Sequence, residues 1–129
     1  MKKTLALAAA IGFLVPSLAL AEGDADRGAK VFKKCKACHV VNQEKNKVGP
    51  HLFGLFGRKA GSVEGYRYSK AMIAKGEEGL VWNEETLNEF LAKPRSFVKG
   101  TKISFSGLKK EQQRLDLISY LKKAGAKSE

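Results

Sequence analysis

Apolar residues recur every three to four positions in four stretches of the chain, which is the spacing of an amphipathic helix. The first predicted helix begins at Asp24, whose carboxylate suits an N-cap, and runs to about Lys34. The last runs from about Lys109 to Ala124 and is followed by Gly125. The buried face of the first helix is expected to carry Ala25, Gly28, Ala29 and Phe32.

Two shorter helices are predicted between these. One follows Ser69 as its N-cap and stops at Gly76, because a helix end favours a glycine in the left-handed conformation. The other is capped by Asn83 and ended by Pro94. Its buried side is expected to carry Leu87, Phe90 and Leu91.

No stretch alternates apolar and polar residues for long enough to predict a strand. Residues 40–67 are rich in Gly, Pro and Asn and show little periodicity. Such a long irregular stretch is uncommon in a compact domain unless something else organises it. The sequence therefore predicts an all-α, loop-rich fold whose helices wrap around a bound group.

The N-terminal segment has the three regions of a secretory signal peptide. Lys2 and Lys3 precede an apolar stretch that ends in Ala-Leu-Ala, the small residues of a cleavage site. The alternative is an uncleaved anchor, but the apolar stretch is short for a membrane span and contains Pro16. We expect residues 1–21 to be removed and residues 22–129 to form the mature periplasmic domain. Loss of the two lysines lowers the net charge from +11 to +9.

Length and charge narrow the function classes. A chain of 129 residues is one domain at most, which excludes multidomain enzymes. The basic charge is compatible with nucleic-acid binding, but the predicted secretion and the lack of a recognised motif argue against it. Loose contact with an anionic membrane surface stays open. A domain this small is expected to need a cofactor, metal or disulfide to complete its core.

Cys35, Cys38 and His39 form a Cys-Lys-Ala-Cys-His stretch, the attachment signature of c-type haem. The two thiols add across the haem vinyl groups, and the adjacent imidazole reaches the iron. A redox disulfide is a competing interpretation, but that motif belongs to a strand–helix junction, which is not predicted here. A zinc site would need further ligands, usually a second cysteine pair, and the chain has two cysteines. We therefore expect one covalent haem c with His39 as an axial ligand.

With this motif in place, the chain resembles the class I cytochromes c, small soluble electron carriers of mitochondria and bacteria. The likeness extends over nearly all of residues 22–129. It includes Gly28 and Phe32 before the cysteines, Val48-Gly49-Pro50, Leu55-Phe56-Gly57-Arg58-Lys59, Tyr66–Tyr68, Trp82, Gly100-Thr101-Lys102 and the closing stretch 117–123. The resemblance implies a small cytochrome c fold, a monomer, and a crossing of the first and last helices at Gly28, Phe32 and Tyr120.

The resemblance also implies roles around the haem. Pro50 would offer its carbonyl oxygen to the second ring nitrogen of His39, a bond that fixes the tautomer of an axial ligand. The haem propionates would be held by Arg58, Tyr68 and Trp82. His51 follows Pro50 on the His39 side of the haem, so we interpret it as a surface or hydrogen-bonding histidine.

The distal side departs from the family pattern. Family members carry a methionine ligand after Gly-Thr-Lys, but here that position is Ile103, which has no lone pair for iron. The sixth position is then empty or water-bound, or it is taken by another side chain. The candidates are Lys102, Lys99 and Met72. A lysine would first have to lose its ammonium proton. Phe90 also falls where the family often has a tyrosine.

Together these features imply an electron carrier rather than an enzyme. Seven basic residues lie between Arg27 and Lys47, and a second group lies between Arg95 and Lys110. Both would border the haem edge and dock onto acidic faces of membrane complexes, a reductase and an oxidase or photosynthetic reaction centre. The alternative is a haem protein whose open distal site binds small ligands or has weak peroxidase activity, although no distal His or Arg is expected to help cleave a peroxide bond.

Overall fold

The computed structural model describes residues 10, 12 and 23–126. Its helices are α1 (Ala25–Phe32), α2 (Lys70–Glu77), α3 (Glu84–Ala92), α4 (Pro94–Phe97) and α5 (Glu111–Leu121), followed by a π-helical turn, Lys122–Ala126. The described residues form no strand, and one isolated antiparallel bridge joins Lys59 to Val81. The predicted all-α, loop-rich fold is confirmed. Apart from residues 10 and 12, the predicted signal peptide lies outside the described part of the chain.

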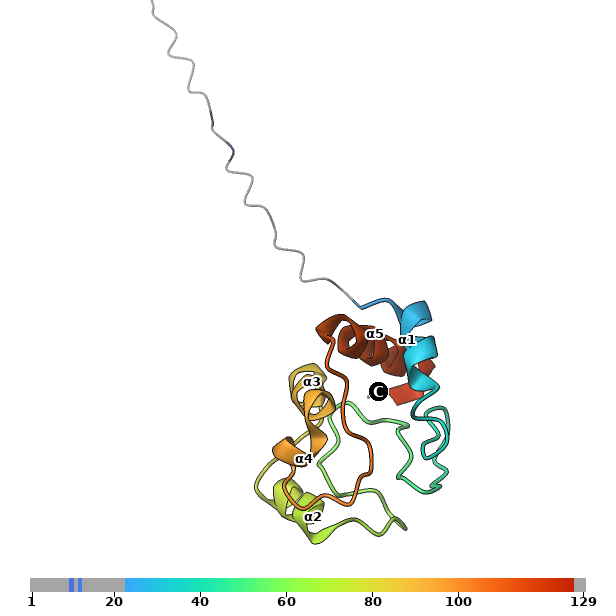
Figure 1. The fold of residues 1–129 in the computed structure, drawn as a ribbon, viewed down its shortest axis with the longest axis vertical. Coiled ribbons are helices and arrows are strands. Elements are labelled where there is room, and N and C mark those ends of the chain that lie inside the picture. The colour runs from blue at the N-terminus through green and yellow to red at the C-terminus, as the bar shows by residue number, and fades with distance from the viewer. Residues whose placement is uncertain (1–9, 11, 13–22, 127–129) are drawn as a thin grey trace, which may run out of the picture.

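Helices α1 and α5 come from opposite ends of the described chain and cross against each other (Figure 1). They approach closely because Gly28 has no side chain. A Cβ at this position would overlap the carbonyl oxygen of Asp116 and would lie 2.7 Å from the Cβ of Tyr120. The rings of Phe32 and Tyr120 pack beside this contact with their centroids 5.1 Å apart.

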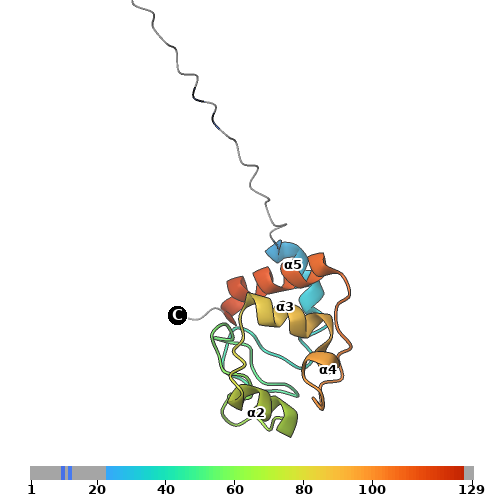
Figure 2. The same ribbon diagram turned by 90° about the vertical axis from the view of Figure 1, so that its left-hand side faces the viewer.

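Helix α3 packs along α5, and α2 lies at the far end of the domain (Figure 2). A capping box starts α3: the Asn83 side chain accepts from the Thr86 amide, and the Thr86 hydroxyl accepts from the Asn83 amide. Its buried residues are Leu87, Phe90 and Leu91, as predicted. Pro94 follows α3 and also starts α4, a short helix that the periodicity did not predict.

None of the helices within 23–126 has the length and apolar character needed to cross a membrane.

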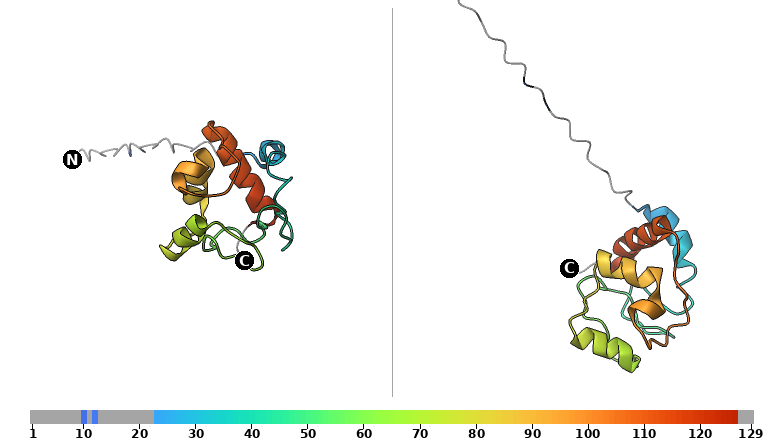
Figure 3. Two further views of the ribbon diagram at one scale, coloured as in Figure 1. Left: turned by 60° about the horizontal axis from the view of Figure 1, so that its bottom comes forward. Right: turned by 60° about the vertical axis from the view of Figure 1, so that its left-hand side comes forward.

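Irregular chain fills the space between α2 and the α1–α5 pair (Figure 3). The core gathers Trp82, Phe90 and Leu117 with apolar residues from the loops. This arrangement leaves the middle of the domain to be lined by loops as well as helices.

The prediction that Gly76 ends the second helix is wrong. Gly76 lies inside α2, which continues to Glu77, and the left-handed residue after the helix is Gly79, with φ of 104°. A Cβ on the buried Gly76 would overlap the carbonyl oxygen of Ala60. The glycine is therefore required by a close approach of two backbones and not by the helix end.

The π-helical turn fastens the end of α5 to segment 52–57. The amides of Gly54 and Phe56 donate to the carbonyl oxygens of Gly125 and Ala126, at 2.9 and 2.8 Å. Ala126 is fully buried, and Gly125 reverses the chain with φ of 129°. The last helix is consequently shorter than predicted, because the backbone turns here to make these bonds.

Candidate cofactor-binding site

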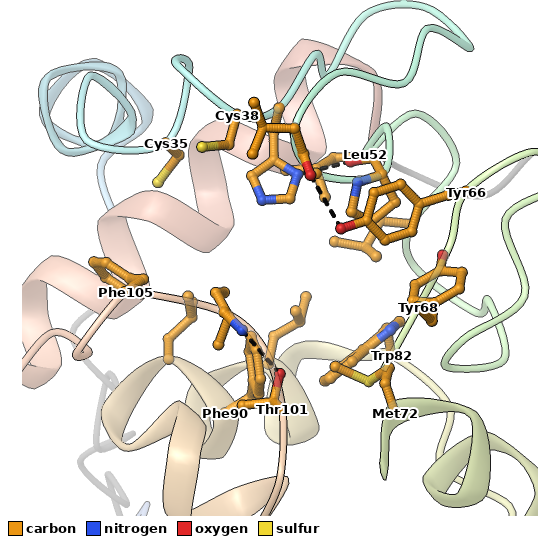
Figure 4. Close-up of a pocket in the computed structure, with 18 of the residues that line it drawn as sticks. Cys35, Cys38, Leu52, Tyr66, Tyr68, Met72, Trp82, Phe90, Thr101 and Phe105 are labelled. Atoms are coloured by element: carbon orange, nitrogen blue, oxygen red, sulfur yellow. Dashed lines mark hydrogen bonds between the residues drawn. The ribbon is translucent and has the colours of Figure 1, made fainter. Parts of the chain in front are cut away.

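A cavity of about 360 Å³ opens between the helices and the loops (Figure 4). Segments from along the described chain line it: the end of α1 and the turn after it, the loops over 48–69, the irregular segment 101–105, and residues of helices α2, α3 and α5. Its walls are mainly apolar and include Phe32, Leu52, Leu55, Leu87, Phe90 and Phe105. The cavity is therefore the place in the fold where the predicted bound group would lie.

Cys35 and Cys38 lie together at one edge of this cavity (Figure 4). The chain leaves α1 in a tight turn, in which the amides of Cys38 and His39 both donate to the carbonyl oxygen of Cys35, at 3.1 and 3.0 Å. Both thiols are free and half-buried. Burial raises the pKa of the Cys35 thiol, and the nearby Lys34 ammonium lowers it in part. No disulfide joins the pair, so both sulfur atoms are available for attachment.

The His39 imidazole lines the same edge, and its tautomer is fixed by the chain. Nδ1 lies 2.7 Å from the carbonyl oxygen of Pro50. Because a carbonyl oxygen only accepts, Nδ1 carries the proton and Nε2 keeps a free lone pair. Burial lowers the pKa of His39 while the Pro50 bond raises it, which favours the neutral ring that a metal ligand needs. This is the bond expected from the family resemblance.

Gly49 makes room for the His39 ring, a role that the sequence analysis did not predict. Its amide donates to the Cys38 carbonyl oxygen at 2.8 Å. A Cβ at Gly49 would lie 2.9 Å from both ring nitrogens of His39 and would collide with Cε1 between them. The Gly-Pro pair therefore acts as one unit, in which Gly49 makes room for the imidazole and Pro50 orients it. Its position directly before Pro50 was the available signal.

Arg58, Tyr68 and Trp82 all line the cavity. Tyr68 and Trp82 lie across it from the cysteines (Figure 4). The Trp82 amide donates to the carbonyl oxygen of Arg58 at 2.9 Å, which holds these two residues side by side. The Tyr68 hydroxyl accepts from the Val63 amide at 3.0 Å, and burial raises its pKa, so it stays protonated and able to donate. Three hydrogen-bond donors thus occupy one wall of an otherwise apolar cavity.

His51 lies outside the cavity lining, behind Arg58. Its amide donates to the Asn46 side chain at 3.0 Å, and its carbonyl oxygen accepts from Arg58 Nη1 at 2.9 Å. Its ring nitrogen Nδ1 lies 3.3 Å from Arg58 Nη2. Its interpretation as a hydrogen-bonding histidine is confirmed, and its ring partner was not foreseen.

Ile103 lines the cavity, and its amide lies 3.4 Å from the hydroxyl of Thr101. Phe90 contributes a ring to the same cavity, so no hydroxyl stands at that position. Figure 4 places Phe90 and Thr101 across the cavity from Cys38. The lining around Ile103 and Phe90 is thus built largely from carbon.

The three candidate sixth ligands lie in different surroundings. Lys102 lines the cavity, but its ammonium donates to the carbonyl oxygen of Arg67 and lies 5.6 Å from the centre of the Tyr66 ring. Lys99 is exposed and is not part of the lining. Met72 lines the cavity next to Trp82, at the end away from the cysteines (Figure 4). None of them occupies the position of Ile103.

Segment 99–107, here called the distal strap, is held by few backbone bonds. Between Thr101 and Leu108, no backbone amide of the described chain donates to a backbone carbonyl oxygen. Side chains attach it instead: Lys102 bonds the Arg67 carbonyl oxygen, and Arg95 donates to the Ser104 carbonyl oxygen at 3.2 Å.

The residues present fit a haem group. The cavity offers a broad apolar space for a macrocycle, two thiols at one edge for covalent attachment, and a neutral imidazole with a free nitrogen beside them. Hydrogen-bond donors on the wall across from the cysteines suit carboxylates of the same group. A zinc site is not supported, because the described residues contain no cluster of three or more His, Cys, Asp or Glu side chains.

Comparison with known proteins agrees with this geometry. The family model described as cytochrome c matches residues 25–125. Cytochrome c from Stellaria longipes is 52% identical over 102 residues, which cover 78% of this chain and 92% of that protein. Cytochrome c2 from Afifella marina is 50% identical over 96 residues, covering 74% and 77%. Among solved structures, cytochrome cH from Methylobacterium extorquens superposes with a TM-score of 0.71 at 44% identity and covers 78% of this chain and 99% of its own.

Proposed function

The chain belongs to the cytochrome c family, and we propose that it is a periplasmic carrier that passes single electrons between membrane redox complexes. It binds one covalent haem c, which when bound supplies reversible exchange of one electron. The observation that carries the proposal is the meeting of Cys35, Cys38 and His39 at one edge of an apolar cavity. The predicted signal over 1–21 supports the periplasmic location.

The residues of the cavity would divide the work of holding the haem. Cys35 and Cys38 would attach it through thioether bonds, and His39 would be the axial ligand, with its tautomer set by Pro50. The propionates would be held by Arg58, Tyr68 and Trp82. The mainly apolar walls offer water few hydrogen-bond partners, which would limit the reorganisation that slows electron transfer.

Positive charge around the cavity supports an acidic docking partner. Lys34 and Lys102 contribute to its lining, and exposed lysines continue along the turn that carries the cysteines. A basic surface of this kind steers a protein onto an acidic face quickly and reversibly. The partners would be a reductase and an oxidase or photosynthetic reaction centre, with loose contact to the membrane surface between encounters.

The rate of oxidation by a membrane oxidase tests this role. We expect the rate to fall as salt is raised, because salt screens the attraction between the two surfaces. Lys34→Glu should lower the rate at low salt several-fold. Lys123→Glu makes the same charge change on an exposed lysine outside the cavity lining and should have a smaller effect. Equal rates for the two variants would overturn the proposed docking surface, and no oxidation at any salt concentration would overturn the carrier role.

A second candidate function rests on Ile103. This side chain lines the cavity where the family has its methionine ligand, and it offers no atom that can bind iron. An open distal position would bind small neutral molecules, and the carbon-rich wall around Phe90 would not repel them. Weak peroxidase activity is the other possibility for such a site.

Carbon monoxide distinguishes the two functions. A ferrous absorption spectrum that shifts at once on addition of the gas would favour ligand binding. A spectrum that the gas leaves unchanged would mean that a side chain, Met72 or Lys102, fills the sixth position, and would favour electron transfer alone. Met72→Leu and Lys102→Gln would then identify which of the two it is, since only the variant that lacks the ligand should acquire the shift.

A further inference from the structure

Arg58 is held from behind by the segment that carries His51. Its guanidinium donates to two backbone carbonyl oxygens, from Nη1 to His51 at 2.9 Å and from Nη2 to Phe53 at 2.5 Å. Nη2 also lies 3.3 Å from Nδ1 of the His51 ring. The His51 amide is itself fixed by the Asn46 side chain, at 3.0 Å. One side of the guanidinium is thus set by His51, while Arg58 lines the cavity.

The ring contact depends on the charge of His51. A guanidinium nitrogen only donates, so Nδ1 must accept and His51 must be neutral with its proton on Nε2. Protonation of Nδ1 would place two N–H donors and two positive charges against each other. The chain contains two histidines, and His39 is engaged as a ligand. His51 is therefore the histidine left free to take up a proton.

We propose that His51 is a positioning residue for Arg58 and a proton-binding site that couples the reduction potential of the protein to pH. A proton on His51 adds a positive charge directly behind the cavity wall. Uptake of an electron removes a positive charge from inside that wall. The reduced protein therefore binds the His51 proton more tightly than the oxidised protein does, and the potential falls as pH rises through the titration of His51.

The step balances as one electron and one proton. The oxidised protein with neutral His51 takes an electron from its donor and a proton from water, giving the reduced protein with His51 as imidazolium. For charges on the order of 10 Å apart in a partly solvated site, proton affinity changes by about fourfold between the two oxidation states. That change corresponds to about 35 mV, because a tenfold change is 59 mV for a one-electron couple.

Other charges around the pair modify this coupling without replacing it. Burial and the Arg58 charge lower the pKa of His51, whereas Glu44, on the loop before the Gly-Pro unit, and a bond to the Phe53 backbone raise it in part. Burial lowers the pKa of Arg58, and the Glu44 carboxylate offsets part of this; Tyr68, from the opposite loop, is neutral. Their net effect places the His51 titration below the ordinary histidine range, so the change in potential is expected on the acid side of neutrality.

Mediated potentiometry of the haem-loaded protein between pH 4.5 and about 8 tests the proposal. The wild type should show a higher potential at low pH. His51→Asn is the matched variant, because its side-chain oxygen can replace Nδ1 as the acceptor for Arg58 but does not titrate. It should follow the wild type above the His51 titration and stay flat below it. A His51→Asn variant that keeps the slope, or a wild type without one, would overturn the proposal.

A measurement on the wild type alone guards against a variant that fails to fold. The ring proton resonances of His51 give its pKa in the reduced and in the oxidised protein, and the two must differ by the amount that the potential requires. Equal values overturn the proposal. It rests on the proposed function only in that the bound haem takes up one electron. Failure to react with any oxidase would refute the carrier role and leave these measurements valid.

Discussion

Replacing Asp116 by asparagine should destabilise the protein at neutral pH and leave it unchanged near pH 2. Asp116 is 3% exposed, and its carboxylate joins the two ends of the described chain. It accepts from the backbone amide of Asp24 at 2.8 Å, from Arg27 Nε at 3.0 Å and from the Gln112 side chain at 2.9 Å. Asparagine keeps the shape and one acceptor oxygen but loses the charge that these donors stabilise.

The size of the effect follows from the proton affinity. Bonding to Arg27 comes first among the causes that lower the pKa of Asp116, from 3.8 to about 2. Each unit by which the pKa differs between the folded and the unfolded chain is worth about 1.4 kcal/mol in the free energy of unfolding. The charge of Asp116 therefore contributes at most about 2.5 kcal/mol. Arg27 is 57% exposed, so solvent screens the pair and about 1–2 kcal/mol is a better expectation. Because the folded pKa is the lower one, this stability is present above pH 4 and is lost as pH falls toward 2.

Urea unfolding of the haem-loaded protein at several pH values between 2 and 7 measures this, with the difference between wild type and variant as the quantity of interest. Asp26→Asn is the control, because it changes an exposed carboxylate on α1, the helix that carries Arg27, and this carboxylate makes no ion pair within the described residues. Arg27→Gln should remove most of the effect of Asp116→Asn when the two are combined. A difference that does not depend on pH, or one that survives in the Arg27→Gln background, would refute the reasoning.

Three further predictions concern the cavity and the helix crossing. Gly28→Ala should cost about 3 kcal/mol in urea unfolding, because the new Cβ would overlap the Asp116 carbonyl oxygen; a cost below about 1 kcal/mol would mean that α1 and α5 can separate easily. Gly49→Ala should displace the His39 ring and change the absorption spectrum of the loaded protein, and an unchanged spectrum would show that the loop yields instead. Ile103→Met should raise the reduction potential and weaken carbon monoxide binding roughly tenfold or more; a variant that binds the gas as its parent does would contradict the role given to Ile103.

The helices and the cavity edge with the cysteines were predictable because local chemistry decides them. Asn83 caps α3 through bonds to Thr86, three residues along the chain. Cys35, Cys38 and His39 form a recognisable motif within five residues. Gly76 was misread because a glycine at a helix end and a glycine under a crossing backbone look the same in a sequence. Only the fold shows that Ala60 passes over it.

Polar contacts between residues far apart along the chain could not be predicted from the sequence either. Asp116 lies among apolar residues of α5, and its partners Asp24 and Arg27 are some ninety positions away along the chain. The ring of His51 gives no sign in the sequence that Arg58 will lie against it. Both contacts exist because the folded backbone brings distant segments together, which periodicity and motif spacing do not describe.

The two sides of the cavity should differ in how easily they open. The His39 side is tied by backbone bonds from Gly49 to Cys38 and from Leu52 to Val40, whereas the distal strap relies on a few side chains. Segments with so few protected amides open by local unfolding at a free energy well below that of the whole domain. Amide hydrogens of the strap should therefore exchange with solvent long before those around Gly49. A strap that opens separately would let mutation change this side of the cavity without disturbing the turn that carries the cysteines.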